Sequence, residues 1–102
     1  MSIPAGHLDS MCIPIRKVAE DDTTVTYRFE SSYWVKNPEY PSRHKIYCTY
    51  YGEILVDKDT KECVVATAMP HDTGKVSSRS LRAFVGHLER GAYPATTMWA
   101  CG

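Results

Sequence analysis

Residues 45–69 read KIYCTYYGEILVDKDTKECVVATAM, a stretch that predicts one long β-hairpin. Side chains alternate between the two faces of a strand, and the residues from Ile46 to Asp57 sort in this way. We expect the core face to carry Ile46, Cys48, Tyr50, Gly52, Ile54 and Val56, and the opposite face to carry Tyr47, Thr49, Tyr51, Glu53, Leu55 and Asp57. Turn-forming residues then lead into an apolar strand, residues 63–69, so the hairpin should lie centrally in a sheet.

The composition is that of a small soluble globular domain. A chain of 102 residues can form one core, and its 43% apolar and 24% charged residues are ordinary values. The 12 basic and 12 acidic side chains cancel, which argues against nucleic acid as a partner. No apolar run approaches the roughly 20 residues of a membrane span, and no signal-peptide pattern is present. We therefore expect a cytoplasmic protein without a membrane partner.

The cysteines, at positions 12, 48, 63 and 101, show no metal-binding spacing. None belongs to a C-x-x-C pair or precedes a histidine at ligand spacing, so we expect reduced thiols rather than a disulfide framework or a zinc site, and no cofactor. If the central hairpin turns at its Asp-Thr step, Val56 lies opposite Cys63. Cys48 then lies opposite His71, and a disulfide between Cys48 and Cys63 would require a different register.

The N-terminal third predicts a leader followed by a second hairpin. Residues 1–10 show no periodicity and contain a proline and a glycine, so we interpret them as a flexible leader or an expression remnant. Residues 11–16 and 24–30 both alternate, and the polar turn of residues 20–23 lies between them. Pro14 has no N–H to donate to a neighbouring strand, so we expect the first of these strands at the edge of the sheet.

Residues 31–44, SSYWVKNPEYPSRH, predict a long loop because prolines interrupt the alternation. Aromatic side chains on such a loop can cover the end of the core or contact a partner. We expect Trp34 to cover the core, with partner contact as the alternative, and we expect Tyr33 and Tyr40 to contact a partner. Arg43 belongs to a small basic cluster at the end of the loop, which could meet an acidic or phosphate surface.

A helical period begins at Ser77. The residues that recur on one helical face are Leu81, Phe84, Val85 and Leu88. This spacing predicts a helix of about three turns with that face on the core. Ser77 or Ser78 could cap its first turn, and Gly91 suits the left-handed residue after its last turn. Gly86 in its middle predicts a close approach to a strand.

Together these segments predict one α+β domain over residues 11–102. We expect an antiparallel sheet of at least four strands, formed by two hairpins, with one C-terminal helix packed on one face. The tail, residues 95–101, should add a final strand or pack Trp99 against the helix.

The sequence contains no catalytic signature. P-loop, dinucleotide, EF-hand and H-E-x-x-H patterns are absent, and His44, His71 and His87 are scattered. The best candidate for a catalytic pair is His71 with Asp72, but a loop histidine beside an aspartate is more often structural. We therefore predict a non-enzymatic protein and keep a small enzyme centred on these two residues as the alternative.

The chain has a recognisable order of segments: IPIRKV, an acidic turn, VTYRF, YGEILVDKDT with a second strand, a helix and a closing GAYPATTMWA. This layout, over residues 11–101, resembles that of small bacterial immunity-type proteins, which accompany secreted or contact-delivered toxins. The resemblance implies a cytoplasmic protein that binds and blocks one toxin domain. The near-neutral charge departs from the acidic character of inhibitors of basic nucleases and leaves the activity of the toxin open.

Tyrosines are concentrated where the central hairpin should meet the aromatic loop. A tyrosine-rich outer row is unlike a purely solvated surface and predicts an interface, either with a partner or between two copies. The candidate partner-binding residues are Tyr33, Trp34, Tyr40, Arg43, Tyr47, Tyr51 and Glu53. We predict a non-enzymatic protein-binding module with a toxin domain as its partner. The alternative is a homodimer or a self-associating structural protein.

Overall fold

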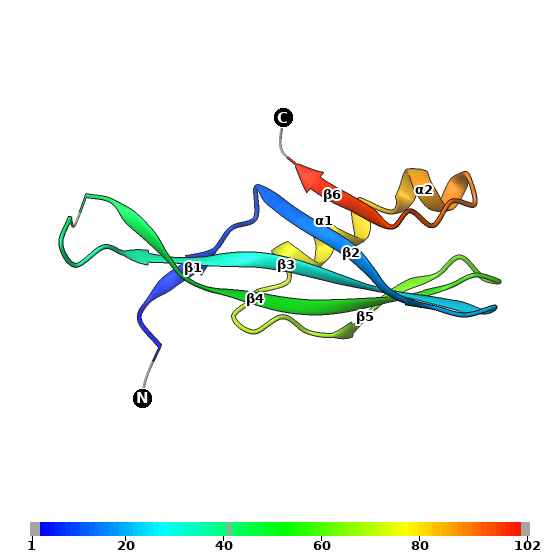
Figure 1. The fold of residues 1–102 in the computed structure, drawn as a ribbon, viewed down its shortest axis with the longest axis horizontal. Helices are drawn as coiled ribbons and strands as arrows, with labels where there is room; N and C mark the ends of the chain where they lie inside the picture. Colours follow the sequence, from blue (N-terminus) through cyan, green and yellow to red (C-terminus); the bar gives the residue numbers. More distant parts are fainter. Residues whose placement is uncertain (1–2, 41, 101–102) are drawn as a thin grey trace.

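An antiparallel sheet with a bent C-terminal helix forms the protein, as expected (Figure 1). The computed structural model describes residues 3–40 and 42–100. Its elements are β1 (Gly6–Leu8), β2 (Cys12–Glu20), β3 (Thr24–Lys36), β4 (His44–Asp57), β5 (Cys63–Thr67), α1 (Lys75–Arg82), α2 (Val85–Glu89) and β6 (Thr96–Ala100). The strand order is β5-β4-β3-β2-β6, and β1 pairs with the C-terminal part of β3. The α+β class is therefore confirmed.

β3 and β4 form a long hairpin where a loop between two hairpins was expected. They pair from Thr24 opposite Asp57 to Lys36 opposite His44. The prediction of a loop over residues 31–44 is therefore wrong, and the connection between the two strands is confined to residues 37–43. Buried and half-buried residues alternate through β3. Ser31 is buried and continues the series of buried apolar residues before it. Pro38 lies beyond the end of β3 and does not end the strand early.

A β-bulge reverses the faces on which the side chains at the N-terminal end of β4 lie. Tyr33 lies opposite Cys48, but the next residue, Trp34, lies opposite Ile46, so Tyr47 is the extra residue. Ile46 consequently shares a face with Trp34 and is exposed, which corrects its expected place in the core. The ring of Tyr47 lies 6.3 Å from that of Tyr33, so Tyr47 does not continue the expected outer row.

β2 lies inside the sheet and not at its edge, which corrects another expectation. β6 pairs with it from Cys12 opposite Ala100 to Arg16 opposite Thr96. Pro14 precedes the first residue that pairs with β3, Ile15, and this position accommodates its missing N–H. Both alternatives for the tail are realised, since β6 forms and Trp99 packs near the helix, with the Arg79 guanidinium 5.8 Å from its ring.

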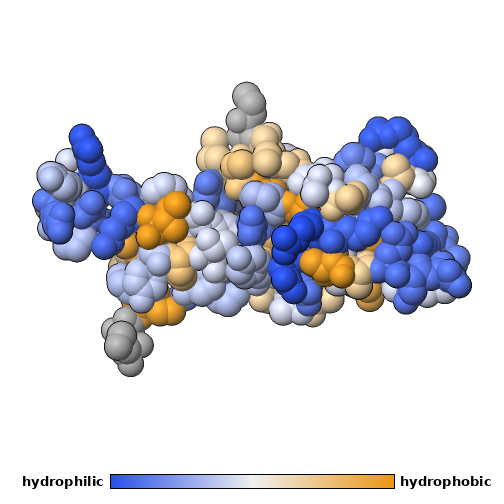
Figure 2. Space-filling view, in the orientation of Figure 1, coloured by the Kyte–Doolittle hydropathy of each residue, from blue (hydrophilic) through white to orange (hydrophobic). Residues whose placement is uncertain are grey.

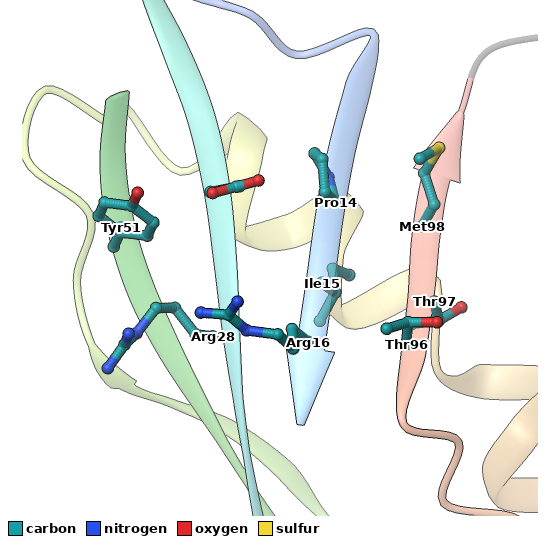
Figure 3. Close-up of a pocket in the computed structure, with 9 residues that line it drawn as sticks. Pro14, Ile15, Arg16, Arg28, Tyr51, Thr96, Thr97 and Met98 are labelled. Atoms are coloured by element: carbon teal, nitrogen blue, oxygen red, sulfur yellow. The ribbon is translucent and has the colours of Figure 1, made fainter. Parts of the chain in front are cut away.

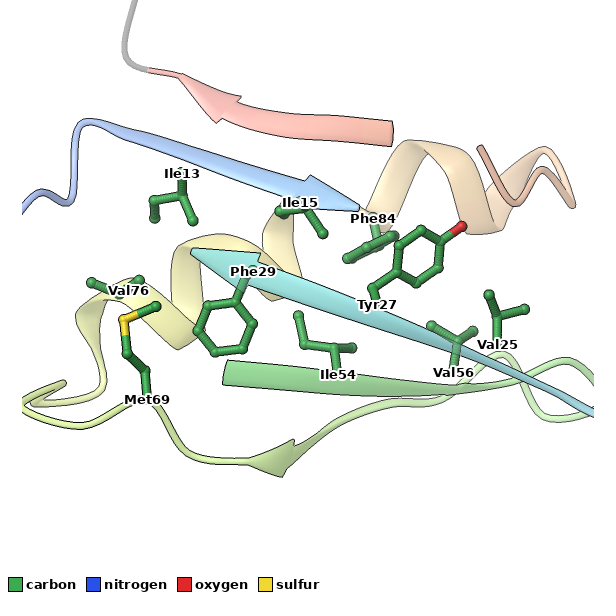
Figure 4. Close-up of a cluster of buried hydrophobic side chains, with 10 residues drawn as sticks. All are labelled: Ile13, Ile15, Val25, Tyr27, Phe29, Ile54, Val56, Met69, Val76 and Phe84. Carbon is green, nitrogen blue, oxygen red and sulfur yellow. The ribbon is translucent and has the colours of Figure 1, made fainter. Parts of the chain in front are cut away.

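The core lies between one face of the sheet and the two helices (Figure 4). Its members are Ile13, Ile15, Val25, Tyr27, Phe29, Ile54, Val56, Met69, Val76 and Phe84. The Tyr27 hydroxyl donates a hydrogen bond of 2.8 Å to the Pro94 carbonyl, which ties β3 to the segment before β6. Burial of the phenol raises the pKa of Tyr27 to about 12. This hydroxyl is therefore held neutral inside the fold.

The helix starts earlier and is shorter than its period predicted. α1 begins at Lys75, and the Asp72 carboxylate, not a serine hydroxyl, accepts hydrogen bonds from the N–H groups of Val76 and Ser77. The helix breaks after Arg82, and this break turns Val85 outward, where it is 55% exposed. The expected core position of Val85 is therefore wrong. The left-handed backbone of Gly91, at φ 66°, is confirmed.

Gly52 allows a close approach between neighbouring strands, whereas Gly86, where this was expected, does not. A Cβ on Gly52 would lie 2.3 Å from the Phe29 ring, whereas a Cβ on Gly86 would meet only the Arg90 guanidinium at 3.4 Å. We expect Gly52→Ala to lower the free energy of unfolding by about 1–3 kcal/mol, because the ring must move. Urea unfolding measures this loss, with Gly86→Ala as the matched control. Equal midpoints for the two variants would contradict the prediction.

Part of the stretch expected to be a flexible leader forms β1. Gly6 lies opposite Val35 and Leu8 lies opposite Tyr33. The Tyr33 hydroxyl donates a hydrogen bond of 2.9 Å to the Pro4 carbonyl, and the Ser31 hydroxyl donates to the carbonyl of residue 9. These contacts hold the described N-terminal residues against the β3–β4 hairpin.

Candidate interaction surface

The face of the sheet opposite the helices is the candidate site. Along β2, the buried residues Ile13 and Ile15 alternate with Pro14 and Arg16, which point to the other side. The same alternation runs through β3 and the later part of β4. Both helices of the described chain pack on the core face, so no helix of residues 3–40 and 42–100 covers the opposite face.

This uncovered face is hollowed across β2, β3, β4 and β6 (Figure 3). The hollow has a volume of about 440 Å³ and is lined by Pro14, Ile15, Arg16, Arg28, Glu30, Tyr51, Thr96, Thr97 and Met98. Figure 3 shows an upper row of Tyr51, Pro14 and Met98 and a lower row with Arg28, Arg16 and Thr96. Figure 2 shows hydrophobic surface near β6 beside hydrophilic surface over the middle of the sheet.

The two arginines of the hollow have different electrostatic surroundings. The Arg28 guanidinium lies 3.7 Å from the Glu53 carboxylate and 5.8 Å from the centre of the Tyr51 ring. Arg16 stands opposite Arg28 in the β2–β3 register and is exposed. Among the described residues, no ion pair within 4.0 Å involves Arg16 or Glu30. Arg16 thus carries the less compensated of the two positive charges.

The predicted partner-binding residues lie in three separate places. Tyr51 and Glu53 lie on the uncovered face. Tyr40 is exposed at the tip of the β3–β4 hairpin, and the Arg43 guanidinium lies 5.9 Å from its ring centre. Trp34 is half-buried near the same tip, where Ile46 lies opposite it.

Tyr33 and Tyr47 occupy the third place, on the core side of the hairpin. Tyr33 is only 5% exposed, because it lies within β3 and not on a loop. Its ring contacts those of Tyr47 and Tyr50 at 6.3 and 5.7 Å. A hydrogen bond with the Cys48 side chain, together with burial, raises the pKa of Tyr50 to about 12. The predicted set is therefore not one continuous surface.

Sequence reasoning missed the residues that complete the hollow. Arg16 and Arg28 alternate with buried residues, so their orientation could have been read from the strand period. Their position opposite each other depends on the β2–β3 register, and Met98 joins Pro14 only because β6 pairs with β2. No local sequence signal specifies that pairing.

His71 and Asp72 are held by contacts that serve the fold. The His71 ring lies 5.1 Å from the Tyr33 ring and 5.0 Å from the Tyr50 ring. One Asp72 carboxylate oxygen accepts from Gly74 and Val76 N–H and the other accepts from Ser77 N–H. Within the described ranges, no hydrogen bond joins the two side chains. Asp72 therefore has a structural role at the start of α1.

The cysteines and metal-binding side chains give no further site. Cys12, Cys48 and Cys63 are free thiols, and Cys101 lies outside the described residues. Cys63 lies opposite Val56, as expected, and burial raises the pKa of its thiol. The β4–β5 pairing begins at Glu53, so the expected pairing of Cys48 with His71 is wrong. The part of the chain that the structure describes holds no group of three potential metal ligands.

No protein-family model, curated protein or solved structure matches this chain. The described residues also include no helix long and apolar enough to span a membrane. The function is therefore inferred from the geometry of the chain itself.

Proposed function

We propose that the protein is a non-enzymatic binding module that holds a protein partner on its uncovered sheet face. The observation that carries this proposal is the hollow across β2, β3, β4 and β6. An antiparallel sheet can leave one face in water, and such a face is then usually polar. Here Tyr51 and Met98 are 47% and 50% exposed at the hollow, beside two arginines. Tyrosine, methionine and arginine are enriched in protein interfaces.

The partner that we propose is a bacterial toxin domain, met in the cytoplasm. This part of the proposal comes from the resemblance of the segment order to immunity-type proteins. The geometry is compatible with such a role, because a blocking protein needs a stable surface and no catalytic group. The His71 and Asp72 contacts described above also favour a binding protein over an enzyme.

The test is Tyr51→Ala with a toxin domain encoded beside the gene of this protein. We expect the affinity to fall about 30-fold or more, because an aromatic anchor in an interface often contributes about 2 kcal/mol. Isothermal titration calorimetry measures the affinity, and survival of toxin-expressing cells measures the protection. Val85→Ala is the matched control, since Val85 is an exposed apolar residue of the helical layer.

Other results would relocate or reject this function. A loss confined to Tyr40→Ala and Arg43→Ala would place the interface at the hairpin tip. If no toxin gene lies nearby and the purified chain binds only itself, a self-associating structural protein replaces the binding module.

A further inference from the structure

We infer that the hollow recognises a carboxylate with an adjoining aliphatic side chain, so that the protein partner presents an acidic and apolar segment to it. This inference rests on the proposed function and specifies the chemistry of the partner. It is carried by the arrangement of the charged and apolar residues that line the hollow.

The positive charge comes from Arg16 and Arg28, which face each other across β2 and β3. Like charges on directly opposed residues destabilise a sheet. Glu53 lies 3.7 Å from Arg28, whereas Arg16 forms no ion pair within 4.0 Å among residues 3–40 and 42–100. A carboxylate bound between the two guanidinium groups would relieve this repulsion and accept several charge-assisted hydrogen bonds.

The apolar contact comes from the row of the hollow next to the arginines. Pro14 and Met98 lie opposite each other in the β2–β6 register, and Tyr51 lies in the same row beyond Glu30 (Figure 3). Their ring and thioether surfaces offer a place for an aliphatic side chain adjacent to the carboxylate. A free inorganic anion would use the arginines alone and leave this row without a role.

Glu30 provides an independent check, because it also lines the hollow. It lies opposite Tyr51 in the β3–β4 register, and its carboxylate would repel a bound anion. Neutralising Glu30 should therefore strengthen binding of an acidic ligand, whereas neutralising Arg16 should weaken it. A second copy of this chain would instead pair Arg16 with the Glu30 of its neighbour, so both changes would weaken self-association.

The experiment is an NMR titration of the isotope-labelled full chain with two peptides, acetyl-Leu-Glu-Leu-amide and acetyl-Leu-Gln-Leu-amide. We expect saturable shifts of the Arg16, Arg28, Tyr51 and Met98 signals with the glutamate peptide. The glutamine peptide should bind about tenfold more weakly, as expected for the loss of one hydrogen-bonded charge. Inorganic phosphate serves as the third ligand and should bind more weakly than the glutamate peptide.

Two variants set the sign of the effect. Arg16→Gln should weaken the glutamate peptide about tenfold, and Glu30→Gln should strengthen it about two- to fivefold. Equal binding of both peptides, tighter binding of phosphate, or weakening by both variants together with concentration-dependent self-association would each overturn the inference. If Arg16→Gln leaves toxin binding unchanged while Tyr51→Ala abolishes it, the inference fails and the proposed function stands.

Discussion

Replacing Phe84 with alanine should lower the free energy of unfolding by about 3–5 kcal/mol. Phe84 is 1% exposed, and its ring centre lies 4.5 Å from that of Tyr27 on β3. Phe84 lies between α1 and α2, at the bend of the helix, and its ring packs against the sheet there (Figure 4). Its removal would leave a cavity that two rigid layers cannot close.

Urea unfolding followed by circular dichroism measures this loss. The control is Val85→Ala, which changes the adjacent residue, 55% exposed, and should alter stability by no more than about 0.5 kcal/mol. A loss below about 1 kcal/mol for Phe84→Ala would mean that the helix does not pack on the sheet through this residue. Equal losses for both variants would contradict the bend between α1 and α2, which buries Phe84 and exposes Val85.

The sequence period predicted the parts of the fold whose alternation is unbroken. Ile54 and Val56 point into the core as expected, and so does Phe84 from the helical segment. The prediction failed at Ile46, because one extra residue in a strand reverses the faces of all residues beyond it. A bulge is defined by the pairing with the partner strand. The alternation within one strand therefore does not predict where the bulge lies.

The candidate site was harder to predict than the fold. Tyr51 could be placed on the uncovered face from the period of β4 alone. The residues that surround it, Arg16, Arg28 and Met98, come from three other strands, and their proximity follows from the strand order. The prolines after Lys36 predict a long loop over residues 31–44, and this prediction wrongly places the buried Tyr33 among the surface anchors.

A chain that starts at Met11 should be less stable than the full chain by about 3 kcal/mol or more. It would lose β1 and the acceptors of two hydroxyl hydrogen bonds, from Tyr33 to the Pro4 carbonyl and from Ser31 to the carbonyl of residue 9. The acceptor of an Arg79 hydrogen bond, the carbonyl of residue 10, would be lost as well. Each such bond contributes about 1 kcal/mol, and Val35 would lose the strand that pairs opposite it.

A single substitution tests the packing of β1 on β3 without changing the length of the chain. A Cβ on Gly6 would lie 2.2 Å from the backbone oxygen of Trp34, so Gly6→Ala must shift or release β1. We expect it to reproduce about 1–3 kcal/mol of the loss. His7→Ala is the control, because the His7 side chain is exposed and its backbone pairing survives the change. If the truncated chain and both variants unfold at the midpoint of the full chain, residues 4–10 do not contribute to the fold. If the truncated chain and Gly6→Ala are both destabilised and His7→Ala is not, the contact of β1 with β3 is the source of the N-terminal contribution.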